Sequence, residues 1–199
     1  MTARIVVMNH VTLDGVMQAP ARSDEDTRGG FAHGGWAISD EAAGRAMGER
    51  MAAGGGLAGW LFGRRTYEDL LGHWTRQADS PFGPMLEGAA KYVATTTLRE
   101  PPAYANTTLL HGDIADAVAQ LKAEADGVLA IMGSGRLIEA LLPRQLVDEF
   151  LLFVTPCVLG SGRRLFPDGS PLARYHCRQA VTTPNGLLVA TYTRQDEHG

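Results

Sequence analysis

The chain has 199 residues, of which 45% are apolar and 20% charged, and its formal net charge is −4. This composition is typical of a soluble globular protein and argues against a disordered one. An acidic balance without a basic tail argues against binding to nucleic acid or to a membrane surface. No apolar run is long enough for a membrane helix, and the N-terminus lacks a signal-peptide pattern. We therefore expect one cytoplasmic domain over residues 1–199.

Metal and disulfide chemistry have little support in the sequence. The two cysteines, Cys157 and Cys177, form no CxxC pair, and the six histidines show no HxH or HxxxH spacing. No GxSxG motif is present, and Cys157 follows a proline at an apolar strand end, which favours a structural thiol over a nucleophile. We predict neither a metal ion nor a covalent intermediate.

Strands and helices alternate along most of the chain. A long irregular stretch, residues 10–37, follows the first strand and is expected to form a lid or a binding loop. Ser39 is the expected N-cap of the first helix. Predicted strands span residues 4–9, 57–62, 91–95, 107–110, 128–132 and 147–155, and predicted helices span 41–53, 65–71, 114–125 and 136–142.

The C-terminal region has a different pattern. Two alternating segments, residues 175–183 and 187–194, flank the dipeptide Asn185–Gly186, which is a strong hairpin signal. Alternating strands and helices that end in such a hairpin indicate an α/β domain. Its sheet is predicted to be mostly parallel with an antiparallel edge.

One candidate ligand site is the segment IMGSGRLI at residues 131–138. A buried strand ends there, Gly133 and Gly135 permit a tight turn, and a helix then begins. The free N–H groups and the positive dipole end of a helix start suit a phosphate. Ile138 stands where the third glycine of GxGxxG would be, so the segment is not the Rossmann fingerprint. A plain structural turn is the alternative interpretation.

Two further strand ends carry similar chemistry. Gly63, Arg64, Arg65 and Thr66 repeat the strand–glycine–helix pattern, and paired arginines suit a diphosphate, although a solvated helix start is the alternative. A threonine run that includes Thr95 and Thr96 fits a phosphate or a ribose, or simply strand propensity. Loops at the carboxyl ends of parallel strands face one crevice, so these groups are expected to converge.

Taken in order, these motifs resemble the dihydrofolate-reductase-like superfamily, in particular the RibD C-terminal type that is related to the riboflavin-pathway reductase domain. The resemblance implies a three-layer αβα sandwich with a mostly parallel central sheet and an antiparallel C-terminal hairpin. The matching segments cover nearly the whole chain: TLDG at 12–15, FGRRTYE at 62–68, VATTTL at 93–98, IMGSG at 131–135, VDEF at 147–150 and PCVLGSGRRLF at 156–166.

The resemblance also implies NADPH as cofactor and hydride transfer to a small heterocyclic substrate. Thr95 or Thr96 would meet the adenosine 2′-phosphate, and the loop at residues 160–162 would lie near the nicotinamide pocket. The residues that would hold the cofactor phosphates are Gly63, Arg64, Arg65 and Thr66 in one turn and Gly133, Ser134, Gly135 and Arg136 in the other.

Asp14 and Glu41 are the candidate catalytic residues. Asp14 matches the Asp–Gly pair of the loop that borders the nicotinamide and the substrate. Glu41 follows Trp36 and Asp40, near the place where dihydrofolate reductases carry the carboxylate that holds the pterin. The alternative is that Asp40 and Glu41 form the acidic first turn of a helix and complement its dipole. The chain lacks the zinc signature of a deaminase.

We therefore predict a homodimeric, NADPH-dependent reductase of a pteridine-like or pyrimidine-like substrate. One alternative is a nucleotide-binding protein without catalysis, in which Asp14, Asp40 and Glu41 all point away from the pocket. The other is an interaction protein that uses the C-terminal hairpin and the strand at 147–154 as its contact. The absence of any NADPH-induced thermal shift would favour that alternative.

Overall fold

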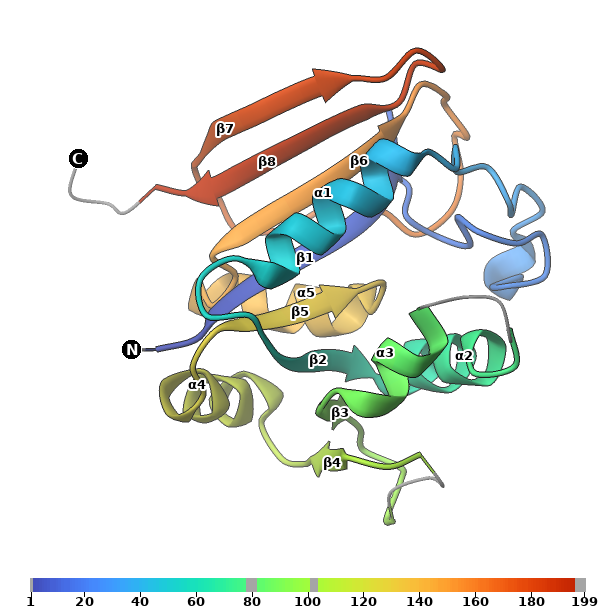
Figure 1. The fold of residues 1–199 in the computed structure, drawn as a ribbon. Helices are drawn as coiled ribbons and strands as arrows, with labels where there is room; N and C mark the ends of the chain where they lie inside the picture. The colour runs from blue at the N-terminus through green and yellow to red at the C-terminus, as the bar shows by residue number, and fades with distance from the viewer. Residues whose placement is uncertain (1, 78–81, 101–103, 196–199) are drawn as a thin grey trace.

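The strands of the protein form one twisted sheet, which we describe from a computed structural model for residues 2–77, 82–100 and 104–195. The strand order is β4-β3-β2-β5-β1-β6-β8-β7 (Figure 1). Pairs among β1 to β6 are parallel, whereas β8 pairs antiparallel with β6 and with β7. The strands are β1 (Arg4–Thr12), β2 (Leu57–Gly63), β3 (Lys91–Ala94), β4 (Thr107–Leu110), β5 (Val128–Met132), β6 (Glu149–Thr155), β7 (Tyr175–Thr182) and β8 (Leu188–Arg194).

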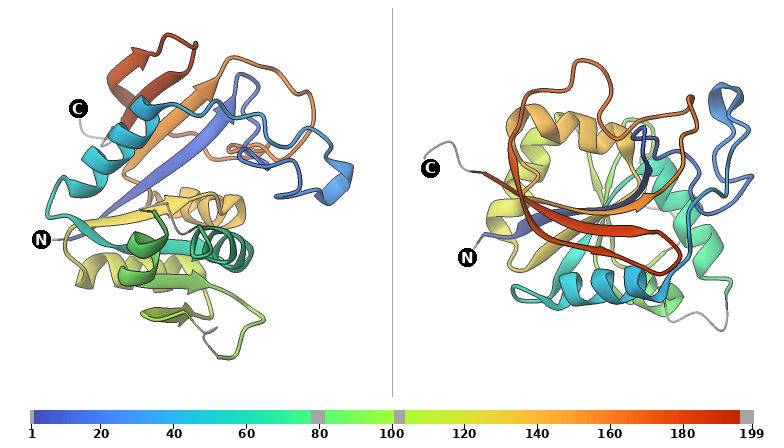
Figure 2. Two further views of the ribbon diagram at one scale, coloured as in Figure 1. Left: turned by 45° about the vertical axis from the view of Figure 1, so that its right-hand side comes forward. Right: turned by 90° about the horizontal axis from the view of Figure 1, so that it is seen from above.

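Helices cover both faces of the sheet, which confirms the predicted three-layer sandwich. One face carries α1 (Glu41–Ala52), α2 (Arg64–Trp74) and α3 (Phe82–Gly88), and the other carries α4 (Ile114–Glu124) and α5 (Gly135–Leu141). Figure 2 shows α1 and α5 on opposite sides of the strands. Two short 3-10 helices are η1 (Arg28–Gly30) and η2 (Leu142–Arg144). In the described residues, no helix is both long and apolar enough to cross a membrane.

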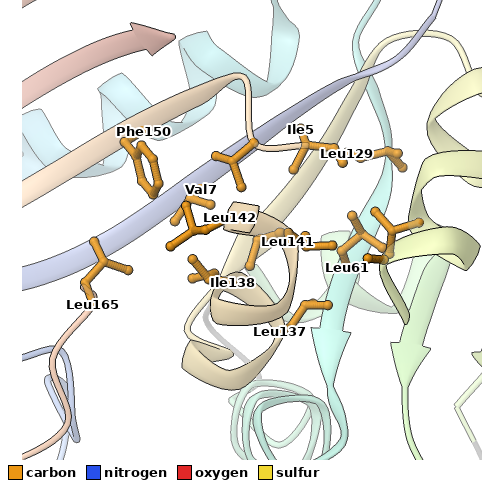
Figure 3. Close-up of a cluster of buried hydrophobic side chains, with 14 of the residues drawn as sticks. Ile5, Val7, Leu61, Leu129, Leu137, Ile138, Leu141, Leu142, Phe150 and Leu165 are labelled. Carbon is orange, nitrogen blue, oxygen red and sulfur yellow. The ribbon is translucent and has the colours of Figure 1, made fainter. Parts of the chain in front are cut away.

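The central strands are apolar on both faces because both faces are covered. Along β1, Ile5 and Val7 pack toward α4 and α5, while Val6 and Met8 pack toward α1, α2 and α3. Figure 3 shows the first of these clusters, with Val7 beside the side chains of α5 and η2. Because its side chains are buried on both faces, β1 has a fixed register relative to its neighbouring strands. The positions of the strand ends, where the candidate site lies, are fixed with it.

Several predicted boundaries are wrong for identifiable reasons. β1 continues to Thr12, because residues 9–12 keep pairing with β6 after β5 has turned away. The cap of α1 is Asp40 rather than Ser39, since the Asp40 side chain accepts a hydrogen bond from the N–H of Ala42 at 2.7 Å. α2 begins at Arg64 and extends to Trp74, and α5 begins at Gly135.

Helix α3 is absent from the sequence prediction because its glycines and proline indicate a turn. Tertiary contacts stabilise it. Leu86 is fully buried, and the Lys91 ammonium, also buried, donates hydrogen bonds to the carbonyls of Leu86 at 2.7 Å, Glu87 at 2.9 Å and Ala89 at 2.7 Å. A lysine that lies 0% exposed thus caps the carboxyl end of this helix.

Candidate functional site

The strand order places the candidate site at the carboxyl ends of β1 and β5. The chain leaves β1 and crosses through α1 on one face to β2, whereas it leaves β5 and crosses through α5 on the other face to β6. These connections diverge, so the two strand ends flank a topological switch point. In open α/β sheets, ligands bind in the crevice at such a point.

Two of the predicted phosphate-binding turns meet at this place. The backbone N–H of Gly63, at the end of β2, donates a hydrogen bond to Ser134 Oγ at 2.8 Å. The N–H of Ser134, after β5, donates to Thr66 Oγ1 at 3.1 Å. The Ser134 hydroxyl therefore binds the turn after β2, and the Thr66 hydroxyl binds the turn after β5. Ser134 is buried and lies in the left-handed region with φ +58°.

Asn9 on β1 joins the same cluster. Its side chain accepts a hydrogen bond from the N–H of Gly133 at 2.7 Å and donates to the carbonyl of Gly133 at 3.4 Å. Gly133 has φ +64°, and a Cβ at this residue would lie 2.9 Å from Thr66 Cγ2. The N–H groups of Gly133 and Ser134 are therefore used inside the protein, and the prediction that they are free is wrong.

The free N–H groups lie one step further on, in the first turns of α2 and α5. Helices α1 and α4 are capped by the side chains of Asp40 and Asp113, whereas neither α2 nor α5 has a side-chain cap. The first N–H groups of a helix have no partner within it. Two uncapped helix starts thus lie side by side, which is favourable for a negatively charged group.

Three arginines surround these helix starts. Arg64 donates to Glu68 Oε1 at 2.8 Å and to Thr97 Oγ1 at 2.7 Å, and so connects α2 with the loop after β3. Arg65 and Arg136 are exposed, and their guanidinium groups form no hydrogen bond with any residue in the described ranges. Both cations are available to a ligand.

The predicted threonines differ in their surroundings. Thr95 is buried, and its Oγ1 accepts hydrogen bonds from the N–H groups of Thr97 at 3.2 Å and Leu98 at 3.0 Å. Thr96 is exposed. Thr95 therefore shapes the loop, and Thr96 directly precedes Thr97, whose hydroxyl accepts the hydrogen bond from Arg64.

Asp14 connects two loops that are far apart in sequence. Its carboxylate accepts hydrogen bonds from Thr12 Oγ1 at 2.5 Å and from the N–H groups of Leu159 at 3.3 Å and Gly160 at 2.8 Å. The Thr12 hydroxyl, with smaller contributions from these backbone N–H groups, lowers the pKa of Asp14 to about 2. Asp14 is therefore ionised at neutral pH and has no proton to donate.

Glu41 occupies a different environment. It is the exposed first residue of α1, and its side chain forms no hydrogen bond with the residues that the structure describes. Its neighbour Asp40 is occupied as the helix cap. This geometry agrees with the alternative interpretation of an acidic helix start.

Two hollows border the site. One, of about 580 Å³, lies between Gln18 and residues 28–31 of the long loop, Gly135 of α5 and the loop at 161–164. The other, of about 460 Å³, lies between Arg22 and Asp24 of the long loop and the Arg65 side of α2. Gly63, Thr66 and the predicted threonines line neither of these two hollows.

The sequence analysis missed three polar residues near the site: Asn9, His10 and Gln18. Gln18 holds the long loop together, since its Nε2 donates to the carbonyls of Asp26 at 3.1 Å and Arg28 at 3.0 Å. Its Oε1 accepts from the N–H of Arg163 at 2.9 Å. The available signal was polarity: Asn9 and His10 interrupt an apolar strand at the place where its carboxyl end meets the crevice.

Metal ligation has no support from the geometry either. Among the described residues, which include every histidine except His198, no group of three or more His, Cys, Asp or Glu side chains lies close enough to hold a metal ion.

The three layers, the mostly parallel sheet with its antiparallel hairpin and the two interlocked turns define a fold of the dihydrofolate-reductase-like class. The sequence profile of the RibD C-terminal domain matches residues 3–189, and the chain belongs to this family.

Individual relatives agree with this assignment. The uncharacterized protein YyaP of Bacillus subtilis (strain 168) is 30% identical over 137 residues, which cover 66% of this chain and 71% of YyaP. A pyrimidine reductase-like protein from Corynebacterium diphtheriae has the same fold with a TM-score of 0.65 and 11% identity, over 98% of this chain and 93% of that one. Dihydrofolate reductase from Enterococcus faecalis, solved as a complex with NADP(H), gives a TM-score of 0.61 and 13% identity, over 98% and 100% of the two chains.

Proposed function

We propose that the protein is an NADPH-dependent reductase that transfers a hydride to a small heterocyclic substrate of the pteridine or pyrimidine class. The observation that carries this proposal is the pair of hydrogen bonds that Ser134 forms with Gly63 and Thr66. They fix two uncapped helix starts side by side at the switch point of the sheet. The family and the fold of dihydrofolate reductase support the same reaction class.

The residues present fit the diphosphate of a dinucleotide. The first-turn N–H groups of α2 and α5 would bind the phosphate oxygens, and the free guanidinium groups of Arg65 and Arg136 would neutralise their charge. When bound, NADPH supplies a hydride from C4 of its nicotinamide ring. The protein's own contribution is to orient both reactants within reach and to exclude water.

The structure also distinguishes the two arginines of the Gly63–Thr66 turn. Arg64 already contacts Thr97, in the threonine loop that is proposed to meet the adenosine 2′-phosphate. We therefore assign Arg64 and Thr96 to the 2′-phosphate, and Arg65 to the diphosphate that NADPH and NADH share. Replacement of Arg64 would then weaken NADPH alone, whereas replacement of Arg65 would weaken both cofactors.

The proposal gives Asp14 a positioning role. Its carboxylate joins the loop after β1 to the loop after β6, and both loops border the hollow beside Gly135. Holding this geometry fixes where the nicotinamide end can lie. Glu41 stays a predicted catalytic residue, and the homodimer likewise stays a prediction.

A second candidate function is nucleotide binding without hydride transfer. It is favoured by the carboxylates, because Asp14 is ionised and bonded to two loops, Asp40 caps α1 and Glu41 is exposed. None of the three is therefore held as a proton donor in the apo protein. A reductase would have to take its proton from solvent or from another residue.

A thermal-shift panel with NADPH, NADH, FMN and dihydrofolate tests the proposal. NADPH at a hundred times its Kd should stabilise the protein by about 2.7 kcal/mol. Oxidation of NADPH, followed by its absorbance with dihydrofolate as the hydride acceptor, then separates a reductase from a binding protein. If none of the dinucleotides shifts the unfolding temperature, the proposal fails and the interaction alternative gains support.

A further inference from the structure

His10 lies near the carboxyl end of β1, one of the two strand ends that flank the switch point. β1 pairs with β5 only as far as Met8, opposite Met132, whereas its pairing with β6 continues to Thr12 and places His10 opposite Phe153. His10 therefore lies two residues beyond the point at which β5 turns away. Alternation along the strand places Asn9 toward Gly133 and α5, and places His10 on the face of α1 and α2, as Met8 is.

The imidazole of His10 is held by packing alone. Its ring lies against Phe153, with the ring centroids 4.9 Å apart and an angle of 36° between the planes. Nδ1 is buried and has no hydrogen-bond partner, and neither ring nitrogen forms a hydrogen bond with any residue of the described ranges. A buried polar atom without a partner destabilises the fold, so such atoms are rare and call for an explanation.

Burial lowers the pKa of His10 to about 4, so the imidazole is neutral at pH 7. A neutral imidazole offers one N–H donor and one nitrogen acceptor. The same face of the sheet carries the partly buried apolar residues Ile38 and Met132. One nitrogen of such an imidazole, beside apolar side chains, can form a single hydrogen bond with an N–H, a carbonyl or a ring nitrogen on the edge of a heterocycle.

We propose that His10 contacts the heterocyclic substrate and selects it by a hydrogen bond to the amide-like edge of the ring. This inference rests on the proposed function, since it names the residue that recognises the substrate of that reaction. Phe153 holds the imidazole in place, and the substrate supplies the partner that the imidazole lacks in the free protein. Asn9, on the opposite face of β1, binds Gly133 in the turn after β5, which is proposed to lie at the cofactor.

The test compares three proteins: wild type, His10→Phe and His176→Phe. His10→Phe keeps an aromatic ring against Phe153 and removes both nitrogens, and His176 is an exposed strand histidine on β7 that serves as the matched control. Each protein is titrated with NADPH alone and then, at saturating NADP⁺, which cannot transfer a hydride, with dihydrofolate and with 5,6-diaminouracil. The unfolding temperature is recorded for each variant.

We expect all three proteins to bind NADPH equally, and His10→Phe to bind the preferred probe about tenfold more weakly than wild type, the loss typical of one hydrogen bond. Its unfolding temperature should not fall, because no intramolecular hydrogen bond is lost. A purely structural role would lower that temperature instead. Equal affinity of wild type and His10→Phe for the probe would overturn the inference and leave the proposed function standing.

If wild type with NADP⁺ bound neither probe, both this inference and the proposed substrate class would be wrong, while the cofactor proposal would stand on the NADPH titration. A second measurement does not depend on the folding of the variant. In wild type labelled with ¹⁵N-histidine, probe binding should shift the ring-nitrogen resonances of His10 and leave those of His176 in place. Unchanged His10 resonances at saturating probe would overturn the inference.

Discussion

Ser134 Oγ accepts a hydrogen bond from the backbone N–H of Gly63 at 2.8 Å and thereby ties the end of β5 to the end of β2. This contact connects the strand-to-helix turn after β2 directly to the strand-to-helix turn after β5. Ser134→Ala should lower the free energy of unfolding by about 1–2 kcal/mol, because the partly buried N–H of Gly63 loses its partner. Chemical denaturation measures this loss, and the same variant should bind NADPH more weakly. Unchanged stability and unchanged NADPH affinity would show that the tie is dispensable.

Gly133 is predicted to be intolerant of a side chain. Gly133→Ala should destabilise the protein by about 2 kcal/mol, because the residue has φ +64° and its Cβ would lie 2.9 Å from Thr66 Cγ2. The double variant Gly133→Ala/Thr66→Ser removes that methyl group and keeps the hydroxyl that binds the N–H of Ser134. Partial recovery of stability in the double variant is expected. No recovery would mean that the backbone conformation, and not the contact with Thr66, sets the cost.

The cap of α1 can be assigned by two alanine substitutions. Asp40→Ala should lower the free energy of unfolding by about 1 kcal/mol, because the N–H of Ala42 loses its acceptor. Ser39→Ala should change it by less than about 0.5 kcal/mol, since Ser39 is exposed and is not the cap. Denaturant unfolding of the two variants in parallel checks this, and the reverse order would restore the sequence prediction of a Ser39 cap.

Asp14 should make stability depend on acid. Its pKa is lowered from 3.8 to about 2 in the folded protein, so the unfolded chain takes up the proton first as the pH falls. The stabilisation from Asp14 is therefore fully present above about pH 4 and is lost toward pH 2. The difference in unfolding free energy between wild type and Asp14→Asn should be constant from pH 8 to 5 and shrink below pH 4. A difference that stays constant down to pH 2 would contradict the assignment.

Short apolar strands bounded by glycines could be predicted closely from the sequence. β5 spans Val128–Met132 as expected, since glycines at 127 and 133 mark both of its ends. The extension of β1 to Thr12 was missed because its last residues are polar and owe their extended conformation to pairing with β6. Helix α3 was missed for a related reason, since the buried Lys91 that caps it follows the helix in sequence and reads as a surface residue.

The candidate site shows the same division between local and long-range information. Both strand-to-helix turns, at residues 63–66 and 133–136, were visible in the sequence because glycine and arginine at strand ends carry a local signal. The contacts that use Asn9 and Asp14 were not, because their partners lie 124 and 145 residues away. A sequence pattern locates turns, but it does not show which side chain will form hydrogen bonds with a turn that is distant in the sequence.

We propose that this chain binds NADPH through local cations in an otherwise acidic protein. Calorimetric titration of the wild-type protein with NADPH and with NADH tests it most directly. We predict that NADPH binds at least about tenfold more tightly, since one charge-assisted hydrogen bond to the extra phosphate contributes about 1.5–3 kcal/mol. Arg64→Ala should abolish this preference, and Arg65→Ala should weaken both cofactors together. Equal affinities of the wild-type protein for NADPH and NADH, or no binding of either, would contradict the account.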